Sequence, residues 1–126
     1  GVNIGLFCST PMVAVSRNVS RKKTMKMLLT GEPIDAKYAK EIGLINDFFE
    51  KEIIEEEVVK LAELVASKSN KVIKIGKQAF YKQLEMPLED AYKYTSEIMS
   101  ENMMAIDAKE GISAFIEKRK PIWKNK

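Results

Sequence analysis

The stretch from residue 25 to residue 46 constrains the fold more than any other, because its helix ends are marked so clearly. An apolar-faced helix over 21–30 should end at Thr30, since Gly31 readily takes the left-handed conformation that closes helices. Pro33 then prevents continuation, because proline lacks the N–H group that a helix interior needs. The sequence therefore predicts a helix followed by a sharp turn.

A second, short helix should follow this turn. Asp35 is a good N-cap for a helix over Ala36–Ile42, and Gly43 supplies its left-handed stop. The apolar run that starts at Leu44 is a candidate short strand over 44–49. This helix, turn, helix and strand connector indicates a fold class but, by itself, no function.

Apolar residues at helical spacing continue through the rest of the chain. Ser9-Thr10-Pro11 is a typical helix start, and Met86-Pro87 marks a boundary between two helices. The predicted helices cover residues 11–17, 21–30, 36–42, 52–68, 71–85, 88–106 and 108–119. The chain is therefore predicted to be mainly α-helical, with one or two short strands.

Two positions in these helices predict local contacts. Gly76 lies on the apolar side of its helix, which indicates close approach of a neighbouring helix, because glycine otherwise costs about 1 kcal/mol in a helix interior. Asp107 and Glu110 have the spacing of a capping box, which predicts Asp107 as the N-cap of the last helix.

The first residues form an apolar run, Val2–Cys8, that reads as extended. An extended segment with few strands nearby leaves backbone groups unpaired, which is costly when they are buried. We therefore expect this chain to be the C-terminal portion of a longer protein. A processed or separately expressed small domain is the alternative.

Two motifs in this order resemble the enoyl-CoA hydratases and isomerases of the crotonase superfamily. The first is Leu-Thr-Gly-Glu-Pro-Ile-Asp-Ala over 29–36, followed by Ala39 and Gly43-Leu44-Ile45. The second is the segment from Glu110 to Trp123, which is similar to that family's C-terminal signature. The resemblance covers nearly all 126 residues and is nearer to the divergent enoyl-CoA hydratase domain-containing proteins than to standard hydratases.

The resemblance implies a fold and a division of the chain. The expected fold is the C-terminal helical portion of a crotonase-like α/β fold. Residues 1–51 would be the end of the crotonase core, with the helix-turn-helix-strand connector. Residues 52–126 would be a helical region that forms trimers and covers coenzyme A (CoA).

The best binding constellation is Phe115 with Lys118, one turn apart near the end of the last helix. A flat apolar ring beside an ammonium group suits an adenine and a phosphate. From the residues alone, the pair is interpreted as a core phenylalanine and an ordinary cationic helix end. In the family, the matching aromatic and lysine meet the adenine and the 3′-phosphate of CoA, which assigns CoA binding to both residues.

No catalytic residue is predicted in this chain. General acid-base work needs paired carboxylates or a histidine, and each Asp and Glu here is expected at a cap, a turn or a solvated face. In the family, the oxyanion hole and the first catalytic glutamate lie upstream. The second glutamate normally precedes the match to Gly5-Leu6 by four residues, where this sequence has Gly1. The resemblance implies hydratase (lyase) activity for the longer protein, and this chain alone should be inactive.

Composition excludes several other classes. The chain has one Cys and no His, so zinc sites and Ser-His or Cys-His catalytic pairs are excluded, and no metal or resident cofactor is expected. A lone cysteine favours a reducing compartment, the cytoplasm or alternatively the mitochondrial matrix. A net charge of +3 without single-sign blocks argues against a nucleic-acid tail. No apolar run reaches the roughly 20 residues of a membrane span.

The expected partners are an acyl-CoA from fatty-acid metabolism and further copies of the chain, because the family's C-terminal helices build trimers and hexamers.

Two rival functions remain. One is a non-enzymatic helical module that self-associates or binds partners through the Met-rich face of helix 88–106, a face for which a core role is the default. The other is nucleic-acid binding through the lysines between Lys71 and Lys82, which lack interleaved aromatics.

Overall fold

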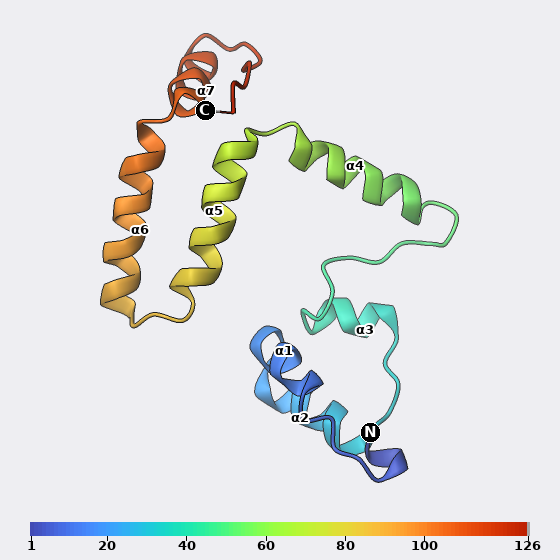
Figure 1. Cartoon of the computed structure of the whole chain (residues 1–126). Helices are drawn as coiled ribbons and strands as arrows, with labels where there is room; N and C mark the ends of the chain where they lie inside the picture. Colours follow the sequence, from blue (N-terminus) through green and yellow to red (C-terminus); the bar gives the residue numbers. More distant parts are fainter. Residues whose placement is uncertain (126) are drawn as a thin grey trace. The chain divides into compact units, whose positions relative to one another are not determined.

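The computed structural model describes residues 1–125, and within them it contains seven α-helices, one short 3₁₀ helix and no strand (Figure 1). The sequence-based prediction of a mainly helical chain is confirmed. The elements are η1 (Val2–Ile4), α1 (Pro11–Asn18), α2 (Arg21–Thr30), α3 (Ala36–Glu41), α4 (Ile54–Ala66), α5 (Asn70–Gln83), α6 (Leu88–Met103) and α7 (Ile106–Ile116).

The predicted short strands are wrong. The run over 44–49 is irregular: the N–H groups of Leu44 and Ile45 both donate to the carbonyl of Ala39, at 2.9 and 3.4 Å. The apolar start of the chain folds into η1, which Gly5 closes at a φ of 76°. A strand needs the edge of a second strand for its backbone groups, and residues 1–125 offer none. Local turns therefore take up these groups.

Two compact units make up the chain, Gly1–Glu57 and Val58–Lys126. In the first, α1 and α2 contact each other, and α2 also contacts η1. The side chain of Asn3 donates to the carbonyl of Gly31 at 3.2 Å, and the buried hydroxyl of Thr24 donates to the carbonyl of Val19 at 3.3 Å. Helix α2, whose last residues begin the motif over 29–36, is thus fixed at both ends by side-chain hydrogen bonds.

The turn chemistry of the connector is confirmed. Gly31 closes α2 at a φ of 61°, and Gly43 follows α3 at a φ of 78°. The carboxylate of Asp35 accepts a hydrogen bond from the backbone N–H of Tyr38 at 2.7 Å, so Asp35 caps α3 as predicted. These positions were predictable because the chemistry of each lies within a few residues of the helix end.

In the second unit, α5 and α6 contact each other and lie side by side, and α6 contacts α7 (Figure 1). The helix predicted over 88–106 stops earlier, because Ala105 is extended at a ψ of 147° and starts α7. The predicted role of Gly76 is also wrong, since no atom would lie within 4 Å of a Cβ added there. Gly76 faces open space rather than a neighbouring helix.

The buried apolar residues of the described chain are all small, one valine and five alanines. The Met-rich face of α6 is open to solvent, with Met99 at 61% and Met103 at 51% exposure, so its default assignment to a core is wrong. Large apolar side chains on α4 are likewise exposed: Val58, Val59, Leu61, Leu64 and Val65. The units thus present more apolar surface than a self-sufficient globular chain usually does.

Candidate functional site

The segment after α7 is held in place by one buried carboxylate. Asp107 is only 1% exposed, and its oxygens accept hydrogen bonds from the hydroxyl of Ser69 and from the backbone N–H groups of Lys124 at 2.6 Å and Asn125 at 2.9 Å. Burial raises the pKa of Asp107, but these donors outweigh it and hold the pKa below its usual range. An ionised carboxylate therefore ties the start of α5 to the chain's last described residues.

Asp107 is not the N-cap that the capping-box pattern predicts. It lies in the first turn of α7, whose N-cap is Ala105. Glu110 does not reach back to the cap but binds the guanidinium of Arg119, at 2.6 and 3.0 Å. It also accepts from the N–H of Ile122 at 2.8 Å. The capping-box prediction is therefore wrong, and both carboxylates bind the returning segment instead.

The Glu110 and Arg119 pair fixes the chain just beyond α7. Hydrogen bonds from Arg119 and from the N–H of Ile122 lower the pKa of Glu110 to about 2. Arg119 also contacts Glu117 at 2.6 Å, and both carboxylates raise its pKa. The guanidinium of Arg119 is therefore paired with the carboxylates of Glu110 and Glu117. It is not a free cation that a ligand could bind.

Trp123 closes one side of a hollow between α5 and α7. Its indole N–H donates to the carbonyl of Ser67 at 2.8 Å, and its ring lies so near Gly111 that an added Cβ would be 3.3 Å from Cη2. We call this space the α5–α7 hollow; its volume is about 550 Å³. It is lined by Lys68, Ser69, Val72, Ile73, Asn102, Met103, Asp107, Ala108, Gly111, Ile112, Phe115 and Trp123.

The two predicted CoA-binding residues lie at the end of α7. Phe115 is 85% exposed and lines the α5–α7 hollow, so it is not a core residue. Lys118 follows the helix in the left-handed conformation, at a φ of 54°, and its N–H donates to the carbonyl of Phe115 at 3.3 Å. The turn brings the backbones of the two residues together, and Lys118 does not line the hollow itself.

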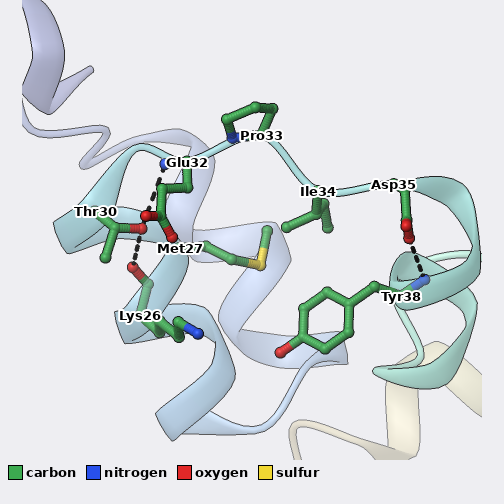
Figure 2. Close-up of a pocket in the computed structure, with 8 residues that line it drawn as sticks. All are labelled: Lys26, Met27, Thr30, Glu32, Pro33, Ile34, Asp35 and Tyr38. Carbon is green, nitrogen blue, oxygen red and sulfur yellow. Dashed lines mark hydrogen bonds between the residues drawn. The ribbon is translucent and has the colours of Figure 1, made fainter.

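A second hollow, of about 330 Å³, lies at the connector between α2 and α3 (Figure 2). Figure 2 shows the side chains of Met27 and Tyr38 lying between the two helices. The ammonium group of Lys23 lies 5.1 Å from the centre of the Tyr38 ring. Of the two carboxylates that line it, Glu32 and Asp35, the latter is engaged in capping α3. These contacts are those of a structural turn.

The described residues contain no group of three or more side chains that is arranged to hold a metal ion. None of the described helices combines the length and apolar character needed to cross a bilayer. At Gly1, where the family resemblance leads one to expect a glutamate, an added Cβ would lie 2.5 Å from Sγ of Cys8 and 2.8 Å from the carbonyl oxygen of Leu6. A side chain at Gly1 would therefore require the backbone at Leu6 to shift.

Sequence reasoning missed the contact between Ser69 and Asp107 and the hollow beside it. These residues are 38 positions apart, and no local pattern links them. The signal that could have pointed to the site is the single tryptophan after Pro121, because a large aromatic behind a helix stop usually packs back on that helix.

Comparisons with known proteins agree with this geometry. The family model described as enoyl-CoA hydratase/isomerase matches residues 1–126. The rat protein named "Enoyl-CoA hydratase domain-containing protein 3, mitochondrial" is 50% identical over 123 residues, which are 98% of this chain and 41% of that protein. The human protein of the same name is 48% identical over the same share. The chain thus spans about two fifths of the length of these relatives, in their C-terminal part.

Solved structures give the same result. The crystal structure of the human domain-containing protein 3 has a TM-score of 0.92 at 48% identity and covers 98% of this chain and 49% of that one. An enoyl-CoA hydratase from Mycobacterium smegmatis has a TM-score of 0.94 at 44% identity, covering 98% and 48%. The resemblance read from the two motifs is confirmed: the chain belongs to the enoyl-CoA hydratase/isomerase family.

Proposed function

We propose that this chain is the part of an acyl-CoA-binding protein of fatty-acid metabolism that holds the nucleotide end of CoA. The observation that carries the proposal is the exposure of Phe115, 85%, at a helix end where the family places an aromatic against adenine. A nearly fully exposed phenylalanine contributes nothing to a core, whereas stacking on a base is worth about 1–3 kcal/mol. Phe115 would take the adenine.

Lys118 would take the 3′-phosphate. Lys118 lies two residues beyond the end of α7. The neighbouring Arg119 is already paired with Glu110 and Glu117. Lysine meets a phosphate as a point charge and needs no fixed fork geometry, which suits an exposed position.

Titration calorimetry of the chain with CoA tests this function. We expect Phe115→Ala to weaken binding about tenfold or more, and Lys118→Ala about fivefold, as an exposed ion pair allows. Ala at position 118 shares the φ constraint of Lys, so the backbone effect of the substitution is small. Ile116→Ala and Lys120→Ala are matched controls, since Ile116 is 72% exposed on the same turn and Lys120 carries the same charge. Equal losses in all four variants would refute the assignment.

The chain itself would not be catalytic. Neither a carboxylate pair nor a histidine is available for the hydration of a double bond, and a glutamate in place of Gly1 would require the backbone at Leu6 to shift. We expect no turnover of a short 2-enoyl-CoA by the purified chain under conditions in which a standard hydratase is active. Measurable turnover would overturn this part of the proposal.

Self-association is the second part of the proposed function. Exposed apolar side chains on α4 and on the Met-rich face of α6 leave much surface to cover, which favours contacts between copies of the chain. This feature also supports the rival function, a non-enzymatic helical interaction module. Sedimentation analysis over a range of concentrations separates a monomer from a trimer or hexamer, and CoA titration separates the two functions.

Two smaller assignments complete the proposal. The rat and human relatives are named as mitochondrial proteins, which favours a mitochondrial compartment over the cytoplasm. Nucleic-acid binding is disfavoured, because the two aromatics among the lysines of α5, Phe80 and Tyr81, form an edge-to-face pair with each other, 5.3 Å apart. A steep salt dependence of oligonucleotide affinity would contradict this last assignment.

A further inference from the structure

Lys118 has a backbone conformation that a lysine disfavours. Its φ is 54°, in the left-handed region, where the Cβ of an L-residue lies too close to the next carbonyl oxygen. Lys118 and Asn125 are the two non-glycine residues with positive φ among residues 1–125, and asparagine tolerates this region better than lysine does. Lys118 is therefore a strained residue that the surrounding structure must hold in place.

The strain arises from the way α7 ends. The N–H of Lys118 donates to the carbonyl of Phe115 at 3.3 Å, and the N–H of Arg119 donates to the carbonyl of Ala114 at 3.0 Å. These two hydrogen bonds form a Schellman motif, in which glycine usually occupies the position of Lys118. Glycine would adopt this φ without strain, so the turn gives no reason for a lysine. Because the lysine side chain is exposed, packing gives no reason for it either.

One carboxylate of α7 holds the chain that follows Lys118. Glu110 binds the guanidinium of Arg119 through both of its oxygens, at 2.6 and 3.0 Å, and accepts from the N–H of Ile122 at 2.8 Å. A contact through two oxygens fixes the direction of the guanidinium as well as its distance. Residues 119 and 122 are thereby tied to α7, so the chain beyond Lys118 is not free to swing away from the helix.

We propose that Glu110 is a positioning residue for the nucleotide end of CoA, which acts through Arg119 to hold Lys118 in the conformation from which it binds the 3′-phosphate. Glu110 itself does not contact CoA. This inference rests on the proposed function, because it requires the contact of Lys118 with the 3′-phosphate. It gives the strain at Lys118 a reason, since a glycine would end α7 equally well but would supply no cation.

The sign of the effect on CoA affinity separates positioning from simple charge. Glu110→Gln and Glu117→Gln each remove one negative charge and one partner of Arg119. If the two carboxylates acted on the phosphate through charge alone, both variants would bind CoA more tightly than the wild type does. Positioning predicts weaker binding for Glu110→Gln only, because Glu110, unlike Glu117, also holds the N–H of Ile122. Glu117→Gln is therefore the matched control.

Calorimetric titrations with CoA and dephospho-CoA, which lacks the 3′-phosphate, make this test. We expect Glu110→Gln to weaken binding of CoA about threefold, against about fivefold for Lys118→Ala, and to leave the affinity for dephospho-CoA unchanged. General damage to the fold would weaken both ligands. In the Lys118→Ala background, Glu110→Gln should have no further effect, since the cation that it positions is absent. Circular dichroism checks that each variant is folded at the temperature of the titration.

The backbone NMR shifts of Lys118 give a readout that does not depend on CoA. Its Cα and Cβ shifts should move away from left-handed values in Glu110→Gln but not in Glu117→Gln. Unchanged shifts in Glu110→Gln, or a loss of CoA affinity in Lys118→Ala without one in Glu110→Gln, would overturn this inference and leave the proposed function standing. An unchanged CoA affinity in Lys118→Ala would instead refute the role of Lys118 in the proposed function, and this inference with it.

Discussion

The hydroxyl of Ser69 donates to the buried carboxylate of Asp107, across 38 positions of the chain. Ser69 also caps α5, since its oxygen accepts from the N–H of Val72 at 3.4 Å. One serine therefore connects the start of α5 to the first turn of α7. The same carboxylate holds the backbone of Lys124 and Asn125, so the second unit depends on this network.

Replacement of Asp107 should destabilise the second unit. In Asp107→Ala, the hydroxyl of Ser69 and two backbone N–H groups lose their acceptor, and buried donors without acceptors are costly. We expect the melting temperature to fall by roughly 5 °C or more. Thermal unfolding followed by circular dichroism measures the change. Asp90→Ala, an exposed aspartate in the first turn of α6, is the control and should have a much smaller effect.

The Glu110 and Arg119 pair should make stability depend on pH in the acid range. The folded pKa of Glu110 is about 2, against an ordinary glutamate value of 4.5. Because the folded pKa is the lower one, the stabilisation is complete above about pH 4.5 and is lost as the pH falls toward 2. Urea unfolding of the wild type and of Glu110→Gln should therefore differ most at neutral pH.

The difference between these two proteins isolates Glu110 from other acidic groups. Asp47 and Asp107 also have lowered pKa values, so the wild type alone would report their combined titration. Their contributions cancel in the comparison. A difference in unfolding free energy that stays constant from pH 7 to pH 2 would contradict the role assigned to the ion pair.

Two helical glycines should respond differently to alanine. Gly76 lies in the interior of α5 with no atom within 4 Å of an added Cβ, so Gly76→Ala should raise the free energy of unfolding by about 1 kcal/mol. Gly111→Ala gains the same helix propensity but pushes against the Trp123 ring at 3.3 Å. We expect no net gain for Gly111→Ala. Urea unfolding measures both, and a destabilised Gly76→Ala would show that α5 is packed at this position.

The assignment of Lys118 to a phosphate can be checked from the ligand's side. Removal of the 3′-phosphate, in dephospho-CoA, should weaken binding to the wild-type chain about as much as Lys118→Ala weakens binding of CoA. The two changes together should cost no more than either one, since both remove the same ion pair. Calorimetric titrations complete this cycle. Additive losses would place the phosphate on another cation, such as Lys120.

Local chemistry decided which parts of the fold could be predicted. The cap at Asp35 and the stops at Gly31 and Gly43 follow from residues within one turn of a helix end, and all three were correct. The strand over 44–49 was wrong because strand formation depends on a partner that no local pattern reveals.

The candidate site also has some parts that could be predicted from the sequence and others that could not. The position of Phe115 and Lys118 at the end of the last helix follows from helical spacing and a helix stop, but the exposure of Phe115 does not, because the spacing places it on the apolar face. The α5–α7 hollow and the contact of Ser69 with Asp107 could not be predicted, because both form only when α5, α6 and α7 come together. The capping-box pattern also misled for this reason: Asp107 and Glu110 had longer-range partners that outweighed the local ones.

The network around Asp107 also sets the order in which the second unit can be completed during synthesis. The N–H group of Asn125 is made 18 residues after Asp107, which at about 5–20 residues per second takes roughly 1–4 s. Until Lys124 is added, Ser69 is the only one of the three donors already synthesised. The second unit can therefore complete this network, and the Trp123 wall of the hollow, only once the last of the described residues have been made.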